Sequence, residues 1–98
     1  MSATTLKVNK NSLMINGELT RHTITRGFER ASKRLQVEAF SNVDLTEVSR
    51  VDTAGLAWLL SLVENAKLSE RQLSFSSVSN DLLKLAKLTG VETFLQVK

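Results

Sequence analysis

A strand-like segment that leads through a polar turn into an apolar helix is the feature that most constrains the fold. It runs from Asn42 to Leu60, and its turn reads Asp52-Thr53-Ala54-Gly55. Asp and Thr are favoured at helix starts, because their side-chain oxygens accept hydrogen bonds from backbone N–H groups that lack helical partners. The turn therefore predicts a helix that begins at Thr53 or Ala54 and runs to about Lys67, with a carboxylate and a hydroxyl at its positive end.

The residues before this unit predict a β-hairpin followed by an amphipathic helix. Residues 6–8 and 13–19 are typical of short strands, and the polar residues 9–12 between them are typical of a turn. Thr20 is the expected cap of the next helix. The apolar face of that helix is expected to consist of residues at helical spacing, namely Ile24, Phe28, Ala31 and Leu35.

Two further strands and a third helix complete the predicted order. Residues 38–45 are expected to form a buried strand, and residues 73–78 alternate as a strand does. Asn80 or Asp81 is the expected cap of the third helix, which Gly90 would end. The residues that follow are expected to form a last strand or an extended tail over 91–97.

Alternating strands and helices indicate the α/β class. Such an order favours right-handed crossovers and a largely parallel sheet, to which the first hairpin adds an antiparallel edge. The length of 98 residues suits one domain over residues 1–98. The expected architecture is a small mixed β-sheet with helices packed against it.

Composition excludes several classes of function. The chain has no cysteine and one histidine, which argues against disulfides and structural zinc. A net charge of +3 is low for a nucleic-acid-binding protein of this size, so no nucleic-acid partner is expected. Residues 1–12 lack the apolar core of a signal peptide, and no apolar run approaches the roughly 20 residues that span a bilayer. We expect a cytoplasmic protein.

The sequence offers no catalytic set. His22 has no serine or cysteine at a spacing that would form a nucleophile–base pair. Asp44, Glu47 and Asp52 are close in sequence, but they lie on a strand end and its loop and are interpreted as solvated acids. The chain contains neither of the two common glycine-rich phosphate-binding motifs, G-x-x-x-x-G-K-[ST] and G-x-G-x-x-G. We therefore expect no enzyme activity, no metal and no cofactor.

A basic stripe marks the first predicted helix. Arg26, Arg30, Lys33 and Arg34 follow helical spacing and are interrupted by Glu29. A solvated surface is the favoured interpretation, and contact with lipid headgroups or with an acidic partner is the alternative.

The second predicted helix carries the candidate contact surface. Leu56, Leu59, Leu60 and Val63 share one side at about 100° per residue and are expected to face the sheet. Trp58 would then point to solvent, and tryptophan is enriched among interface hot spots. The predicted partner-binding residues are Asp52, Thr53, Ala54, Gly55, Ala57, Trp58 and Leu62.

Two simpler interpretations of these residues stay open. Asp52 or Thr53 can serve only as a helix cap, which stabilises a protein by about 1 kcal/mol, and Gly55 can serve only a close backbone approach. Trp58 can be covered by another segment of the chain.

The segment that contains the polar turn resembles a known family. Residues 43–60, VDLTEVSRVDTAGLAWLL, resemble the central signature of STAS domains, the fold of bacterial anti-sigma-factor antagonists. The form DTAG is similar to that of the small stand-alone STAS subunits of Mla transporters. These ABC systems move phospholipids between the membranes of Gram-negative bacteria.

The resemblance implies a non-enzymatic regulatory subunit. Its implied partner is the cytoplasmic ABC ATPase, within a complex that contains a membrane permease. The chain would be peripheral to the inner membrane through that partner, without inserting into the bilayer. The resemblance also implies that Thr53 matters for docking to the ATPase.

One residue departs from the pattern of the anti-sigma-factor antagonists. In those proteins a serine directly before the glycine is phosphorylated by a partner kinase, and here that position is Ala54. The kinase switch therefore does not transfer to this chain. A partner-switch signalling protein remains one alternative, and an enzyme or small-ligand carrier that uses the polar turn is another.

Overall fold

The computed structural model describes residues 4–35 and 40–95. They form a mixed sheet with helices packed against it, which confirms the expected α/β class. The elements in chain order are β1 (Thr5–Asn9), β2 (Ser12–Leu19), α1 (Arg26–Leu35), β3 (Asn42–Asp44), β4 (Val48–Val51), α2 (Thr53–Leu68), β5 (Ser74–Ser76), α3 (Asn80–Leu88) and the 3-10 turn η1 (Glu92–Phe94).

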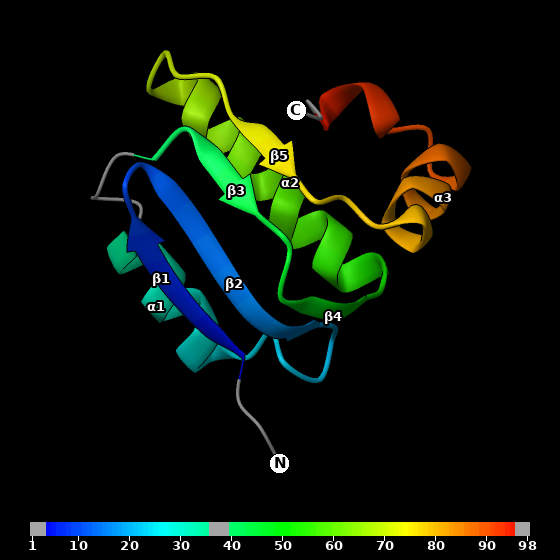
Figure 1. The fold of residues 1–98 in the computed structure, drawn as a ribbon, viewed down its shortest axis with the longest axis horizontal. Coiled ribbons are helices and arrows are strands. Elements are labelled where there is room, and N and C mark those ends of the chain that lie inside the picture. The colour runs from blue at the N-terminus through cyan, green and yellow to red at the C-terminus, as the bar shows by residue number, and fades with distance from the viewer. Residues whose placement is uncertain (1–3, 36–39, 96–98) are drawn as a thin grey trace.

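The sheet combines one antiparallel and several parallel pairings. Its order is β1-β2-β3-β5, with β1 antiparallel to β2 and the other neighbours parallel, and β4 pairs with the far end of β2. Both crossovers advance in the same direction across the sheet, so right-handed connections place their helices on the same face. Figure 1 shows α1 and α2 together behind the strands.

The predicted hairpin is confirmed. β1 and β2 pair from Asn9↔Ser12 to Thr5↔Asn16, and the turn between them contains only Lys10 and Asn11. Both turn residues have positive φ, 48° and 69°. Positive φ at both central residues is typical of a type I′ turn, which suits a two-residue hairpin because its twist matches that of the strands.

One face of the sheet is apolar and the other polar. Leu13, Ile15, Val43 and Phe75 point toward the helices and are at most 1% exposed. The opposite face is polar apart from Met14 and is formed by residues that alternate with the buried ones, namely Ser12, Met14, Asn42, Asp44, Ser74 and Ser76. A mixed sheet can leave one face to solvent in this way because side chains alternate along each strand.

The start of α1 differs from the prediction. Thr25 caps the helix, since its Oγ1 accepts a hydrogen bond of 3.2 Å from the N–H of Phe28. Thr20 lies five residues earlier, in a loop where its own N–H donates to Thr23. The predicted cap at Thr20 is therefore wrong. Of the predicted apolar face, Phe28 is buried and Ala31 is exposed.

Strand β4 was not predicted. Residues 48–51 form a parallel pair with β2 after a register shift at Gly17 and Glu18. Upstream of it, the predicted strand over 38–45 is confined to β3 within the described residues, although Phe40, Val43 and Leu45 are buried as expected. Residues 38 and 39 lie outside the described part of the chain.

The third helix ends as predicted, but neither predicted cap, Asn80 or Asp81, is correct. Its cap is Ser79, whose Oγ accepts from the N–H of Leu82 at 3.1 Å. Gly90 has φ 73°, and the N–H of Val91 bonds the carbonyl of Ala86, which is the Schellman arrangement. The segment after Gly90 forms η1 in place of the predicted strand or tail, and residues 96–97 lie outside the described residues.

Candidate partner-binding site

Asp52 joins the start of α2 to the end of β2. Its Oδ1 accepts a hydrogen bond of 3.0 Å from the N–H of Gly55, and its Oδ2 accepts one of 3.0 Å from the N–H of Arg21. Its own N–H donates to the carbonyl of Leu19 at 3.1 Å. Asp52 is therefore the N-cap of α2, and its carboxylate also holds the loop that follows β2.

These hydrogen bonds also change the acidity of Asp52. Partial burial would raise the pKa of its carboxyl, but the N–H groups of Arg21, Gly55 and Ala54, together with the positive charge of Arg21, lower it below its ordinary value. The carboxylate is thus ionised at neutral pH. Its two oxygens already have partners within the chain.

Gly55 serves a close backbone approach. It is buried, and a Cβ at this position would overlap the carbonyl group of Leu19. The first turn of α2 therefore rests directly on the end of β2. Asp52 and Gly55, which lie on either side of Thr53 and Ala54, are both held by contacts with the end of β2 or the loop after it, so the backbone fixes the position of Thr53.

Thr53 is the first residue of α2 and is exposed. No hydrogen bond within the described residues involves its hydroxyl group, whereas Ala54 beside it is half-buried. The structure therefore presents one free hydroxyl on a rigid turn, at the positive end of a 16-residue helix.

The expected exposure of Trp58 is wrong. The Trp58 side chain is 7% exposed, and its ring lies 4.9 Å from that of Phe28, centroid to centroid, at an angle of 59°. Since α1 packs beside α2 on the same face of the sheet, the buried side of α2 includes the flank that touches α1. Leu62 is 2% exposed on that same side. Neither side chain belongs to the free surface of the protein.

The exposed side of α2 is a different stripe, which we call the α2 outer face. Its side chains recur at i, i+4, i+8, i+11 and i+15 from Thr53 and are all exposed, namely Thr53, Ala57, Ser61, Glu64 and Leu68. Leu68 is 79% exposed, which is high for a large apolar residue. Of the predicted partner-binding residues, only Thr53 and Ala57 lie on this stripe. Helical spacing from Thr53 is the signal that would have identified Ser61, Glu64 and Leu68.

The other acidic candidates have local structural roles. Asp44 accepts hydrogen bonds from the hydroxyl and the N–H of Thr46. These two bonds, the side-chain one first, lower the pKa of Asp44, although burial opposes them. Glu47 is exposed in the loop that follows. Within residues 4–35 and 40–95, no three His, Cys, Asp or Glu side chains are placed to hold a metal ion.

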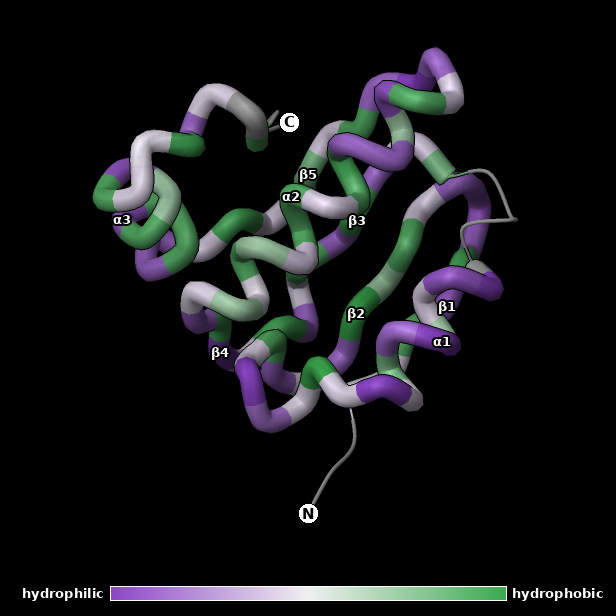
Figure 2. The backbone as a smooth tube through the Cα atoms, turned by 180° about the vertical axis from the view of Figure 1, so that it is seen from behind, coloured by the Kyte–Doolittle hydropathy of each residue, from purple (hydrophilic) through white to green (hydrophobic). Residues whose placement is uncertain are grey.

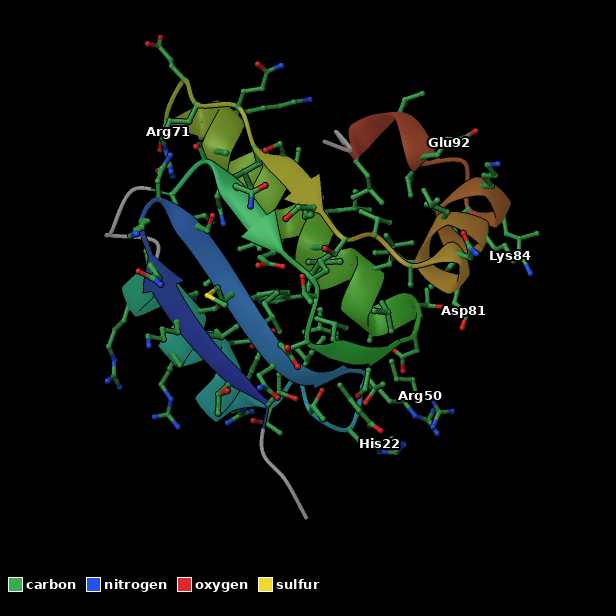
Figure 3. The ribbon with its side chains drawn as sticks, viewed as in Figure 1. His22, Arg50, Arg71, Asp81, Lys84 and Glu92 are labelled. Atoms are coloured by element: carbon green, nitrogen blue, oxygen red, sulfur yellow. The ribbon has the colours of Figure 1, made fainter. Side chains whose placement is uncertain are left out.

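His22 and Arg50 lie at the same end of the sheet as the turn. Figure 3 shows both side chains extending outward below the strands, His22 from the loop after β2 and Arg50 from β4. Both are exposed. They add polar surface at the end of the sheet that carries Asp52 and Thr53.

Comparison with known proteins identifies the family of the chain. The family described as "Mlab, STAS domain" matches residues 2–97. The chain belongs to the STAS family. It is 35% identical over 78 residues to the "Intermembrane phospholipid transport system binding protein MlaB" of Escherichia coli K12, and equally so to the protein of that name in Shigella flexneri. The match covers 80% of this chain and 78% of each relative.

Solved STAS structures share the fold. The anti-sigma factor antagonist SpoIIAA in its unphosphorylated form aligns with a TM-score of 0.68 at 17% identity, over 98% of this chain and 88% of that one. A putative anti-sigma factor antagonist from Thermotoga maritima aligns with a TM-score of 0.69 at 14% identity, over 96% and 84%. At such identities the likeness shows the fold alone. Within the described residues, no helix has the length and apolar character to cross a membrane.

Proposed function

We propose that this STAS domain is a non-enzymatic regulatory subunit of an ABC system that transports phospholipids between membranes. The observation that carries the proposal is its identity of 35%, over 80% of the chain, to proteins named as MlaB of the intermembrane phospholipid transport system. We place the chain in the cytoplasm, at the inner membrane through its partner.

The docking surface that we propose is the α2 outer face together with the turn before it. Thr53 offers a free hydroxyl, and Ala57 and Ser61 are short side chains that let a partner backbone approach closely. Leu68 adds an exposed apolar contact at the far end of the helix. The partner in this proposal is the ABC ATPase subunit, in a complex with the membrane permease.

Rigidity supports this choice of surface. The carboxylate of Asp52 is fixed by two backbone N–H groups, and Gly55 rests on β2. A surface that is already ordered loses little conformational entropy when it binds, which favours affinity. Ser61 is ordered as well, since its hydroxyl donates to the carbonyl of Trp58 at 2.6 Å.

Regulation follows from unequal affinity. A bound subunit changes the balance between two conformations of an ATPase only if it binds one of them more tightly. A subunit of this kind needs no catalytic group of its own, and the role that we assign to Trp58 is to hold α2 in place from beneath the docking surface.

The test is an affinity capture of the tagged chain from detergent-solubilised native cells, read by mass spectrometry. Recovery of an ABC ATPase with its permease supports the transporter subunit. Recovery of a soluble kinase-like anti-sigma factor without a transporter would overturn it in favour of a partner-switch protein. Direct docking is then measured with the purified ATPase by calorimetry, where no heat of binding would reject the ATPase as the contact.

A further inference from the structure

A groove lies between α1 and the ends of β1 and β2. Its volume is about 1040 Å³, at the upper end of the range for small-molecule sites. Leu6, Phe28 and Ala31 supply its apolar wall. Phe28 is 8% exposed, so the groove reaches down to the core of the protein at this point.

The charges along the groove are separated. Glu18 lies at the end where α1 begins, since the Thr23 hydroxyl in the preceding loop donates to the Glu18 carbonyl at 2.7 Å. Arg34 lies in the last turn of α1, and a ten-residue helix is about 15 Å long. An anionic group is therefore favoured at the Arg34 end and disfavoured at the Glu18 end.

The surroundings of the Arg34 end are also basic. Arg30 and Lys33 lie within the four residues before Arg34, and the only acid of α1 is Glu29. Figure 2 shows this helix hydrophilic over most of its length, beside the hydrophobic centre of β2. A polar helix beside an apolar groove suits a ligand that has both characters.

Gly27 has no role in the fold that explains it. It is the second residue of α1, and glycine is a poorer helix former than alanine. A Cβ there would meet only the Oγ1 of Thr25, at 3.8 Å, and the backbone does not require a positive φ. Because Gly27 lines the groove, its missing side chain leaves the groove open.

We propose that this groove binds an anionic single-chain amphiphile, a fatty acid or a lysophospholipid. The acyl chain lies against Leu6 and Phe28, and the anionic head lies at Arg34. The proposal is independent of the docking of α2, because it rests on α1, β1 and the groove between them.

The protein contains its own reporter for this binding. Trp58 is the only tryptophan, and its ring touches that of Phe28 in the groove wall. We would titrate the full chain with dodecanoate and, separately, with lysophosphatidylglycerol, each below its critical micelle concentration, and follow Trp58 emission. Dodecyl maltoside serves as the uncharged probe. A saturable change with either anionic probe, and binding of the maltoside weaker by at least roughly tenfold, is expected.

Three variants locate the binding. Gly27→Leu fills the groove and is expected to abolish the response, and Arg34→Gln is expected to weaken affinity by roughly tenfold. Lys33→Gln removes an equal charge from the same turn of α1, outside the groove, and is expected to change affinity by less than about twofold.

The responses to the probes and variants identify the ligand or overturn the proposal. A response to dodecanoate alone assigns a fatty acid, and a response to lysophosphatidylglycerol alone assigns a lysophospholipid. No saturable response to either, equal affinity for the maltoside, unchanged binding by Gly27→Leu, or equal effects of Arg34→Gln and Lys33→Gln would each overturn the proposal.

Discussion

Gly55 and Leu19 meet backbone against backbone, and this contact places the first turn of α2 on the end of β2. A Cβ at position 55 would overlap the carbonyl oxygen of Leu19 and lie 2.8 Å from its carbonyl carbon. Neither atom is the end of a flexible side chain. Because the same carbonyl accepts the N–H of Asp52, the position of the whole turn depends on this approach.

Gly55→Ala is therefore expected to lower the free energy of unfolding, by about 1–3 kcal/mol, as overpacking of a tight contact does. Gly27→Ala is the matched control, since it adds the same methyl group to a helix where space is free. That control is expected to raise stability by about 0.4–1 kcal/mol. Urea unfolding of both variants checks this. Equal stability of the two variants would show that the contact tolerates a side chain.

Trp58→Ala is expected to destabilise the domain by about 3–5 kcal/mol, as loss of a buried aromatic does. The reason is that Trp58 fills the space between α2 and Phe28 of α1. Phe28→Ala is expected to be costly too, and a double-mutant cycle should give about 0.5–1.5 kcal/mol of coupling between the rings. Trp58 emission in the free protein should be that of a buried indole. Emission typical of a water-exposed indole would contradict this packing.

Stability is expected to fall in acid through Asp52. Its folded-state pKa is below the ordinary value of 3.8, so the stabilisation from its charge is fully present above that value. The stabilisation is lost as pH falls from about 3.8 through the lower folded-state pKa. Asp44 contributes in the same direction, because its pKa is also lowered.

Asp52→Asn keeps a side-chain acceptor at the cap but removes the titration. Acid unfolding followed by circular dichroism should therefore show a weaker dependence of stability on pH below about 4 in this variant. Asp44→Asn serves as the comparison, since Asp44 titrates in a different loop. A wild-type slope in Asp52→Asn would mean that the carboxylate of Asp52 does not gain these hydrogen bonds on folding.

Local chemistry made the turn predictable. Asp52, Thr53 and Gly55 act within one helical turn. Asp and Thr are typical helix caps, and glycine is typical of a close backbone approach, so the residue types predict both features. The hairpin and the end of α3 at Gly90 are local in the same way. The cap of α1 was misplaced because the six residues from Thr20 to Thr25 include three threonines, and composition does not say which of them starts the helix.

Long-range packing decided the features that the sequence did not predict. The prediction that Trp58 is exposed rested on helical spacing with the sheet as the only neighbour of α2. In the structure α1 is a second neighbour, and it covers Trp58. Strand β4 was missed because its four residues show no clear alternation, and its pairing depends on the bulge at Gly17 and Glu18. In both cases the deciding partner lies some 30 residues away in the chain, where local periodicity carries no information.

The docking surface leads to the last prediction. Thr53→Glu is expected to weaken ATPase binding by at least roughly tenfold, because an unpaired charge would be enclosed in the interface. The fold should survive, since Thr53 is exposed and an acid in the first turn suits the helix dipole. Asn80→Glu is the matched control, because Asn80 is the exposed first residue of α3. Calorimetry with the purified ATPase should find that control unchanged, and Thr53→Ser, which keeps the hydroxyl, close to wild type. Full affinity in Thr53→Glu would reduce Thr53 to the first residue of a helix and move the contact elsewhere on the domain.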